Sequence, residues 1–276
     1  MAVHTSRVTR PHTGFSYLDA GREQGAVLAF AHRGGAAHPE IAGLENTLAA
    51  FEHAVALGYR YLETDVHASS DGVLLAFHDH LLDRVTSLEG RVGETAYVDL
   101  ATALIDDREP IPRMADLLEH FPQARFNIDL KSDSAVGPLA DLVEHTGAHD
   151  RVCVGAFSER RLRAFRATVR RPVATSYGPV GVGLSRFAPR QLAQRLLGSR
   201  GDALQVPARI RGVPILTAAF VARAHAAGQP VHVWVVDDEA EMERLLDLGV
   251  DGLMTDRTDV LREVLLRRGQ WWDGAA

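Results

Sequence analysis

The sequence is poor in cysteine and in long apolar runs. Its 276 residues include one cysteine, Cys153, which excludes an internal disulfide framework and is typical of a reducing compartment. No run approaches the roughly 20 apolar residues that a membrane span needs, and residues 1–25 lack the continuous apolar core of a secretory signal. We therefore expect a cytoplasmic protein without a transmembrane segment.

An excess of positive charge is also missing. The chain has 30 basic and 36 acidic residues, a formal net charge of -6 and a pI near 6.1. This balance argues against a nucleic-acid partner held by a basic surface. In addition, no G-x-G-x-x-G motif follows any predicted strand, which argues against a dinucleotide-binding fold.

Short apolar β-like runs alternate with segments of helical spacing along most of the chain. Leaving out one arm of a hairpin, about eight strands are predicted, at residues 27–32, 61–66, 125–130, 152–157, 173–177, 203–206, 231–236 and 252–255. Helices are predicted at residues 47–57, 112–121, 135–146, 159–170, 189–197, 217–227, 239–248 and 259–268. This alternation predicts an α/β fold, the TIM (β/α)8 barrel, and an open doubly wound sheet is the alternative.

The predicted organisation is a single barrel domain at residues 27–276, preceded by an N-terminal extension at residues 1–26. Residues 81–110 are irregular, with scattered charges and two glycines. We expect them to form a small insertion, a lid over one end of the fold.

Residues 61–79 predict a hairpin that gathers polar side chains. Glu63 and Asp65 are two residues apart in a strand, so both point to the same face. A Ser-Asp-Gly turn and a second apolar run then lead to His78. The link is too short for a parallel crossover, so His78 should return beside the two carboxylates. An edge hairpin whose polar residues face water is the alternative.

Polar residues recur at the C-terminal ends of the predicted strands, where a TIM barrel carries its chemistry. The carboxylates of Glu63, Asp65 and Asp129 would form an all-oxygen site for Mg²⁺ or Ca²⁺, whereas Zn²⁺ favours histidine or cysteine. His32 and His78 suit the transfer of protons from a nucleophile and to a leaving oxygen.

Two basic residues accompany this group. Arg33 and Lys131 beside a cation describe an anion clamp, and phosphoryl groups are the substrates that most need one. The simpler alternatives are that Arg33 only pairs with Glu45 and that each histidine is structural.

Motifs in these regions resemble the glycerophosphodiester phosphodiesterases. They occur in the family order and read H-R-G (32–34), E-N-T (45–47), E-T-D-V (63–66), D-G-V-L-L-A-F-H-D (71–79), N-I-D-L-K (127–131), V-W-V-V-D (233–237) and G-V-D-G-L-M-T-D (249–256). The resemblance covers residues 28–265. It implies a TIM barrel that uses one divalent cation, Mg²⁺ or Ca²⁺, to hydrolyse a small-molecule glycerophosphodiester to sn-glycerol 3-phosphate and an alcohol.

The resemblance also implies a role for individual residues. The catalytic pair would be His32 and His78, the metal ligands Glu63, Asp65 and Asp129, the phosphate contacts Arg33 and Lys131, the supporting polar residues Glu45 and Asn46, and an aromatic wall of the glycerol pocket Trp234. In the family mechanism one histidine deprotonates the substrate's own 2-hydroxyl, which attacks phosphorus, and the other protonates the departing alkoxide. We assign the base to His32 and the acid to His78, although the sequence does not settle this order.

Some positions depart from the family pattern. Asp129 stands where glutamate is usual, Val235 and Asp237 where threonine and asparagine are usual, and Leu44 where proline is usual. The shorter Asp129 would shift the metal preference or leave room for a water, whereas the other changes concern the substrate more than the chemistry.

Two rival functions therefore stay open. One is a lysophospholipase D or sphingomyelinase D activity on lipid head groups, and the other is a barrel that binds phosphate esters without turnover. Trp271 and Trp272 are expected in C-terminal packing or, if the protein is a homo-oligomer, in a subunit contact.

Overall fold

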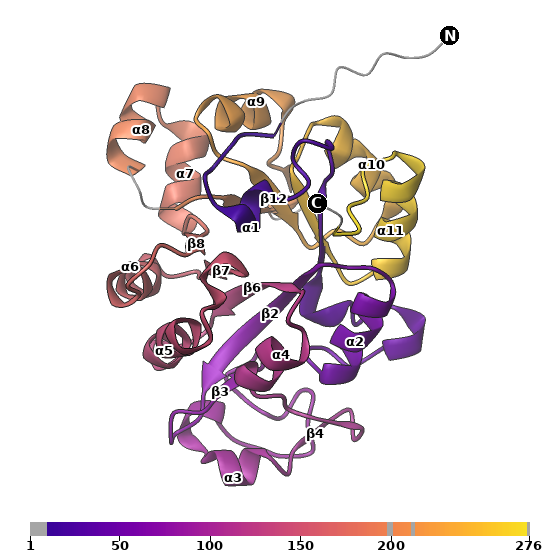
Figure 1. The fold of residues 1–276 in the computed structure, drawn as a ribbon, viewed down its shortest axis with the longest axis vertical. Coiled ribbons are helices and arrows are strands. Elements are labelled where there is room, and N and C mark those ends of the chain that lie inside the picture. Colours follow the sequence, from indigo (N-terminus) through magenta and orange to yellow (C-terminus); the bar gives the residue numbers. More distant parts are fainter. Residues whose placement is uncertain (1–9, 198–200, 211–212, 275–276) are drawn as a thin grey trace.

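The computed structural model describes residues 10–197, 201–210 and 213–274. Within them, eight parallel strands form one curved sheet (Figure 1). In chain order they are β1 (Leu28–Ala31), β2 (Tyr61–Ala68), β6 (Arg125–Leu130), β7 (Val152–Gly155), β8 (Ala174–Thr175), β9 (Leu204–Pro207), β12 (Val231–Trp234) and β13 (Gly252–Thr255).

The order of these strands closes the sheet into a barrel. Apart from β8 and β9, each strand pairs in parallel with the next one along the chain, and β13 pairs back with β1. A parallel bridge between Ser176 and Ala203 joins the end of β8 to the start of β9. The TIM-barrel prediction is confirmed, and the open doubly wound alternative is wrong.

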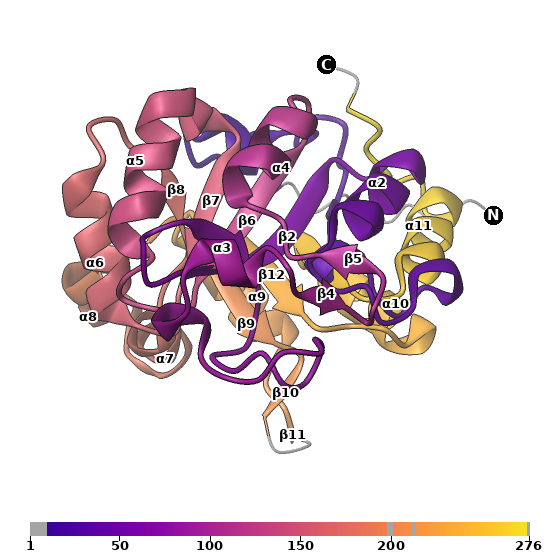
Figure 2. The same cartoon turned by 90° about the horizontal axis from the view of Figure 1, so that it is seen from below.

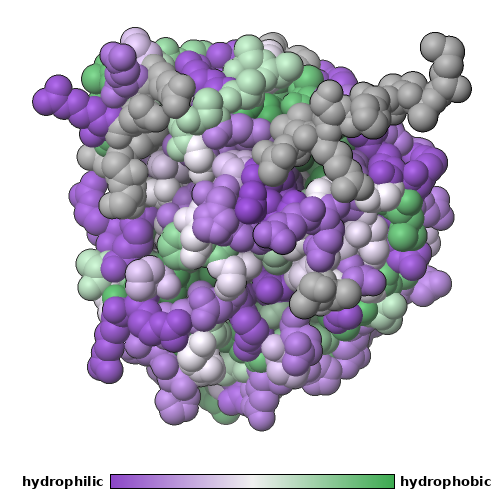
Figure 3. All heavy atoms as spheres, turned by 45° about the horizontal axis from the view of Figure 1, so that its top comes forward, coloured by the Kyte–Doolittle hydropathy of each residue, from purple (hydrophilic) through white to green (hydrophobic). Residues whose placement is uncertain are grey.

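Helices surround the strands (Figures 1 and 2). The longer ones are α2 (Leu48–Ala56), α4 (Met114–His120), α5 (Val136–Thr146), α6 (Glu159–Thr168), α7 (Pro179–Phe187), α8 (Arg190–Leu197), α9 (Ala218–Ala226), α10 (Glu239–Asp247) and α11 (Thr258–Arg267). Their buried residues and those of the outward-facing strand positions form one large apolar cluster. None of the described helices is long and apolar enough to cross a membrane. The face in Figure 3 is mainly hydrophilic, with smaller apolar areas between.

Helix α7 was not predicted, because its sequence P-V-G-V-G is a poor helix former. Pro179 starts the helix, where its fixed φ suits the first turn. Gly181 packs so closely on Tyr177 that a β-carbon would lie 2.8 Å from the ring. Tertiary packing therefore outweighs the low intrinsic propensity here.

The N-terminal extension closes the floor of the barrel. Helix α1 (Ser16–Asp19) buries Tyr17 and Leu18 among inward-facing strand residues that include Phe30 and Tyr61. The Tyr61 hydroxyl donates to the Tyr17 carbonyl at 2.5 Å, and the two rings meet edge to face at 5.1 Å. This apolar floor fixes the strand ends opposite the cavity described below.

The C-terminal tryptophans belong to the same end of the molecule. The ring centroids of Trp271 and Tyr59 are 5.1 Å apart, and those of Trp272 and Tyr61 are 5.9 Å apart. Both tryptophans therefore take part in C-terminal packing within the chain, which was one of the two expectations for them.

The predicted hairpin is present and is followed by the insertion at residues 81–110. Strand β3 (Leu74–Ala76) runs antiparallel to the end of β2. Residues 81–110 consist of turns with a few short elements, and their apolar side chains pack in one cluster with Leu75 and Phe77 of the hairpin. These elements are η3 (Val92–Glu94), α3 (Tyr97–Leu100), β4 (Leu104–Ile105) and β5 (Glu109–Pro110). The remaining short elements are η1 (His32–Gly34), η2 (Pro39–Ile41), η4 (Ala148–Asp150), β10 (Arg209–Ile210) and β11 (Val213–Pro214).

Candidate active site

Strands β2 and β6 deliver the three predicted carboxylates to one place. Glu63 and Asp65 lie on the same face of β2, and Asp65 is the direct neighbour of Asp129 in the parallel register with β6. All three residues are at most 9% exposed. They line one cavity of about 430 Å³ together with His32 and His78. The hairpin therefore returns His78 to the carboxylates and does not lie as a polar edge in water.

The loop after β1 is held tightly against these carboxylates. Arg33 adopts φ 48°, a left-handed conformation that few residues other than glycine take up. Its backbone N–H donates to Glu63 Oε2 at 3.1 Å, and its Nε lies 2.9 Å from Asp65 Oδ2. Gly34 follows at φ 89°, where a β-carbon would lie 2.6 Å from that of Ala50. The H-R-G motif is thus explained by conformation as well as by chemistry.

Each histidine has a carboxylate at Nδ1. His32 Nδ1 lies 2.8 Å from Asp256 Oδ1, and His78 Nδ1 lies 2.5 Å from Asp79 Oδ1. A carboxylate acceptor favours the tautomer with hydrogen on Nδ1, which leaves Nε2 for the substrate. Burial lowers the pKa of His32, but the charge of Glu63 and the hydrogen bond to Asp256 outweigh it, so the pKa is raised overall.

The sequence places Asp256 at the end of the last predicted strand and Asp79 in a motif, but it did not identify either as the partner of a histidine. Asp79 directly follows His78, and Asp256 ends the last strand, so each offered a positional signal. His32 and Asp256, however, are 224 residues apart, and only the closure of the barrel brings them together.

Lys131 and Arg33 compensate part of the buried negative charge. Lys131 Nζ lies 2.6 Å from Asp129 Oδ2 and 2.9 Å from Asp65 Oδ1. Burial acts to raise the pKa of Asp65, but Lys131 and Arg33 hold it below its usual value. Burial and the charge of Asp65 raise the pKa of Glu63 to about 7. Neighbouring carboxylates with pKa values driven apart are typical of functional sites.

The three carboxylates fit a hard divalent cation in number and in donor type. They are buried and offer oxygen alone, the ligand set that Mg²⁺ and Ca²⁺ prefer. Over the described ranges, their oxygens do not form a group lying within 4.8 Å of one another. Lys131 Nζ lies between Asp65 and Asp129, so it and a cation would compete for the same two carboxylates.

Glu45 and Asn46 support the site without lining the cavity. The Asn46 amide donates to Asp65 Oδ2 at 3.2 Å, and its backbone N–H donates to the Arg33 carbonyl at 2.8 Å. Glu45 accepts hydrogen bonds from Arg33 at 3.3 Å and from Arg84 at 2.5 Å. Arg33 thus pairs with both Glu45 and Asp65. The alternative that Arg33 only pairs with Glu45 is therefore incomplete.

An aromatic pair forms an apolar part of the cavity. The ring centroids of Trp234 and Phe157 are 5.6 Å apart and the rings are nearly perpendicular. Lys131 Nζ lies 5.7 Å from the centroid of the Phe157 ring. The cavity lining also includes residues that sequence reasoning missed, namely Asn127, Phe157, Tyr177, Pro179, Val182 and Gln205. Their only signal is position, because most of them lie in or shortly after strands β6 to β9.

A family model for "Glycerophosphoryl diester phosphodiesterase family" matches residues 32–260, most of the chain. The chain belongs to this family. It is therefore a phosphoric diester hydrolase of the family that cleaves glycerophosphodiesters.

Two named relatives match this chain over most of its length and over most of their own. "Probable glycerophosphodiester phosphodiesterase 2" of Mycobacterium tuberculosis is 42% identical over 91% of this chain and 95% of its own. A lysophospholipase D of Rattus norvegicus is 28% identical over 85% of this chain and 84% of its own.

Solved structures agree with the fold. The glycerophosphodiester phosphodiesterase of Agrobacterium tumefaciens superposes with a TM-score of 0.68 at 26% identity, covering 86% of this chain and 99% of that one. A phosphodiesterase of Oleispira antarctica, in complex with its product sn-glycerol-3-phosphate, gives a TM-score of 0.74 at 22% identity over 86% and 96% of the two chains.

Proposed function

We propose that this chain hydrolyses glycerophosphodiesters to sn-glycerol 3-phosphate and an alcohol, with one divalent cation and two histidines. The observation that carries the proposal is the convergence of His32, His78 and three carboxylates on one cavity. The name of the relative from M. tuberculosis and the product held by the O. antarctica enzyme support the same reaction.

Glu63, Asp65 and Asp129 would hold the cation. Their oxygen donors suit Mg²⁺ or Ca²⁺ better than Zn²⁺. When bound, the ion would supply polarisation of a phosphoryl oxygen and a lower pKa for the attacking hydroxyl.

Arg33 and Lys131 would bind the substrate's phosphoryl oxygens. Both basic side chains line the cavity and form ion pairs with Asp65, with Arg33 Nε 2.9 Å from Oδ2 and Lys131 Nζ 2.9 Å from Oδ1. Since the bond network on Arg33 fixes its guanidinium, little side-chain freedom would be lost on binding the anion.

His32 would act as the base and His78 as the acid. His32 is the more enclosed, with 13% of its side chain exposed against 32% for His78, so His78 lies nearer the solvent into which the alcohol departs. His32 Nε2 would take the proton of the glycerol 2-hydroxyl, whose oxygen attacks phosphorus. The bond from phosphorus to the alcohol oxygen then breaks, and His78 gives its proton to that oxygen.

The second half of the reaction reverses the two roles. His78, now neutral, takes a proton from water as the water oxygen attacks the cyclic phosphate. The bond from phosphorus to the 2-oxygen breaks, and His32 returns its proton there. The carboxylates Asp256 and Asp79 would stabilise each imidazolium and keep each ring in place.

A second candidate is the hydrolysis of lysophospholipids, and the apolar part of the cavity favours it. Phe157 lines the cavity, is 64% exposed and lies beside Trp234, while Pro179 and Val182 line it from α7. These side chains give an acyl chain an apolar path from the mouth. The rat lysophospholipase D is similar to this chain over most of its length.

The proposal is tested by the release of sn-glycerol 3-phosphate from glycerophosphocholine at saturating Mg²⁺ or Ca²⁺. The variant His78→Ala should lose about 10²- to 10⁴-fold in rate, because it lacks a general acid. His80→Ala is the matched control, since this ring contacts His67 and does not line the cavity. Equal rates for His78→Ala and the parent would refute the assignment of His78.

A further inference from the structure

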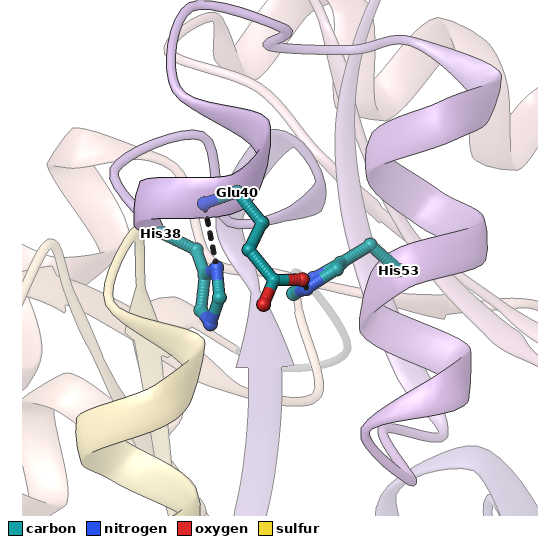
Figure 4. Close-up of side chains that lie close together, drawn as sticks. All are labelled: His38, Glu40 and His53. Carbon is teal, nitrogen blue, oxygen red and sulfur yellow. Dashed lines mark hydrogen bonds and ion pairs between the residues drawn. The ribbon is translucent and has the colours of Figure 1, made fainter.

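We infer that His38, Glu40 and His53 form a second metal site, separate from the carboxylate cavity, which binds a transition-metal cation such as Zn²⁺. Figure 4 shows the three side chains facing one another, with His38 and Glu40 from the η2 segment and His53 from helix α2. Neither the family resemblance nor the proposed reaction uses these residues.

The geometry of the three donors is already close to that of a ligand set. One ligand atom of each residue lies within 4.8 Å of the other two, and no other such group of three occurs in residues 10–197, 201–210 and 213–274. His53 Nε2 lies 3.2 Å from Glu40 Oε2, and the two imidazole rings are 4.2 Å apart. An ion would need only small side-chain shifts to contact all three.

The burial of the two histidine rings suits metal binding. His38 is 9% exposed, whereas the Glu40 side chain is 76% exposed, so the cluster has two enclosed nitrogen donors and one open side. His53 Nδ1 is buried and has no hydrogen-bond partner among the described residues.

The chemistry of the donors separates this site from the cavity. Two imidazoles and one carboxylate, with an open position for water, are the ligand set of zinc sites, whereas the cavity offers carboxylates alone. Nitrogen donors also favour later transition metals over Mg²⁺ and Ca²⁺. The two sites should therefore select different ions from the same solution.

Metal binding would change the hydrogen bond between His53 Nε2 and Glu40 Oε2 and one contact of His38. His38 Nδ1 accepts a hydrogen bond from the Glu40 backbone N–H at 3.2 Å. If Nδ1 binds the ion, its lone pair is no longer free, and if Nε2 binds it, Nδ1 carries the proton. In either case a weak bond at the start of η2 is replaced by metal–ligand bonds.

The position of the site gives it a structural consequence. The ion would tie η2, in the middle of the loop after β1, to α2. The same loop carries His32 and Arg33 at one end and Glu45 and Asn46 at the other. Bound Zn²⁺ would therefore clamp the segment that presents the predicted catalytic base, and it should stabilise the folded chain by mass action.

The test is a titration of the full chain, without any histidine tag, with ZnCl₂ against a chromophoric chelator. Excess Mg²⁺ is present to occupy the carboxylate cavity. We expect one equivalent of Zn²⁺ per chain and a rise in the melting temperature on binding. In His53→Gln and in Glu40→Gln the affinity should fall by about tenfold or more and the rise should be lost.

Glu40→Gln keeps the proposal falsifiable if His53→Gln fails to fold, because the Glu40 side chain is mostly exposed. His120→Gln is the matched control, since His120 pairs with Glu52 at 2.9 Å on the surface but belongs to no group of three ligands over the described ranges. It should bind Zn²⁺ like the parent. Unchanged affinity in Glu40→Gln, or no stoichiometric Zn²⁺ in the parent, would overturn the inference.

Discussion

The inward-facing residues of β2 change character from one end of the barrel to the other. Tyr61, at the start of the strand, packs against Tyr17 and the apolar floor. Glu63 and Asp65, further along the same face, reach the cavity. The strand thus separates two tasks by height, because side chains near its start hold the barrel together and those near its end carry the chemistry. Changes at the two ends should have different measurable effects.

The largest effect is expected at the cavity end, in His32→Ala. The variant loses the proposed base, so glycerophosphocholine hydrolysis should fall by about 10³-fold, within the usual range for general acid–base catalysis. The free energy of unfolding should change by less than about 1 kcal/mol, since the side chain faces the cavity and not the core. Rate assays and urea unfolding of the same preparation check both halves. A variant that is destabilised but fully active would contradict the predicted difference between the two ends of the strand.

The reverse pattern is expected at the floor, in Tyr17→Ala. Removing this 1% exposed ring should lower the free energy of unfolding by about 3 kcal/mol or more, with KM unchanged in the folded fraction.

Tyr17→Phe is the control for the floor variant. The Tyr17 hydroxyl has no hydrogen-bond partner among the described residues, and the contact to Tyr61 uses the backbone carbonyl. Stability should therefore stay close to that of the parent. If Tyr17→Ala instead abolished turnover while leaving stability intact, the division of tasks would be wrong.

A smaller effect concerns pH and the pKa of Glu63 in the absence of divalent cations. Burial raises this pKa from 4.5 to about 7 in the folded state. Between these values the folded chain binds more protons than the unfolded one, so the free energy of unfolding should fall as pH rises. The loss attributable to Glu63 should be on the order of 1–3 kcal/mol between about pH 5 and 7.5.

Glu63→Gln isolates this contribution, because the amide does not titrate. The variant, measured in chelator by urea unfolding across the same range, should show a flatter pH dependence than the parent. Saturating Mg²⁺ should flatten the parent in the same way, since a bound cation favours the carboxylate. Identical slopes in parent and variant would show that Glu63 is already ionised in the folded chain.

The smallest effect is expected at the mouth of the cavity, in Phe157→Ala. If the apolar side binds an acyl chain, the variant should lose about 3- to 10-fold in kcat/KM for lysophosphatidylcholine, a loss typical of one exposed apolar contact. Its kcat/KM for glycerophosphocholine should stay nearly constant. Equal losses on both substrates would assign Phe157 to the glycerol end and weaken the lipid alternative.

Much of the fold was predictable because its signals are local. The strands at residues 125–130 and 252–255 are apolar runs bounded by turn or polar residues, and both match β6 and β13. The insertion at 81–110 has no sustained period, so its short elements and apolar cluster could not be foreseen. Helix α7 depends on contacts such as Gly181 against Tyr177, which propensity does not report.

The site was predictable for residues that lie at the ends of predicted strands, in the hairpin or in motifs. His32, Glu63 and Asp129 were identified in this way, and the structure gathers them around one cavity. Their roles stay predictions. The partner carboxylate Asp256 becomes visible only once the first and last strands pair. The cluster of His38 and His53 was not predicted either, because the two residues are 15 positions apart in loop and helix and no helical spacing links them.

We propose that the buried carboxylates at the end of β2 and β6 make hydrolysis depend on a hard cation. The most direct test measures release of sn-glycerol 3-phosphate from glycerophosphocholine after the protein has been treated with chelator, and again after Mg²⁺ or Ca²⁺ is restored. We predict that the rate falls to background and that either ion, added back, recovers it in the parent but not in Asp65→Asn. Full activity in the presence of chelator would contradict the account.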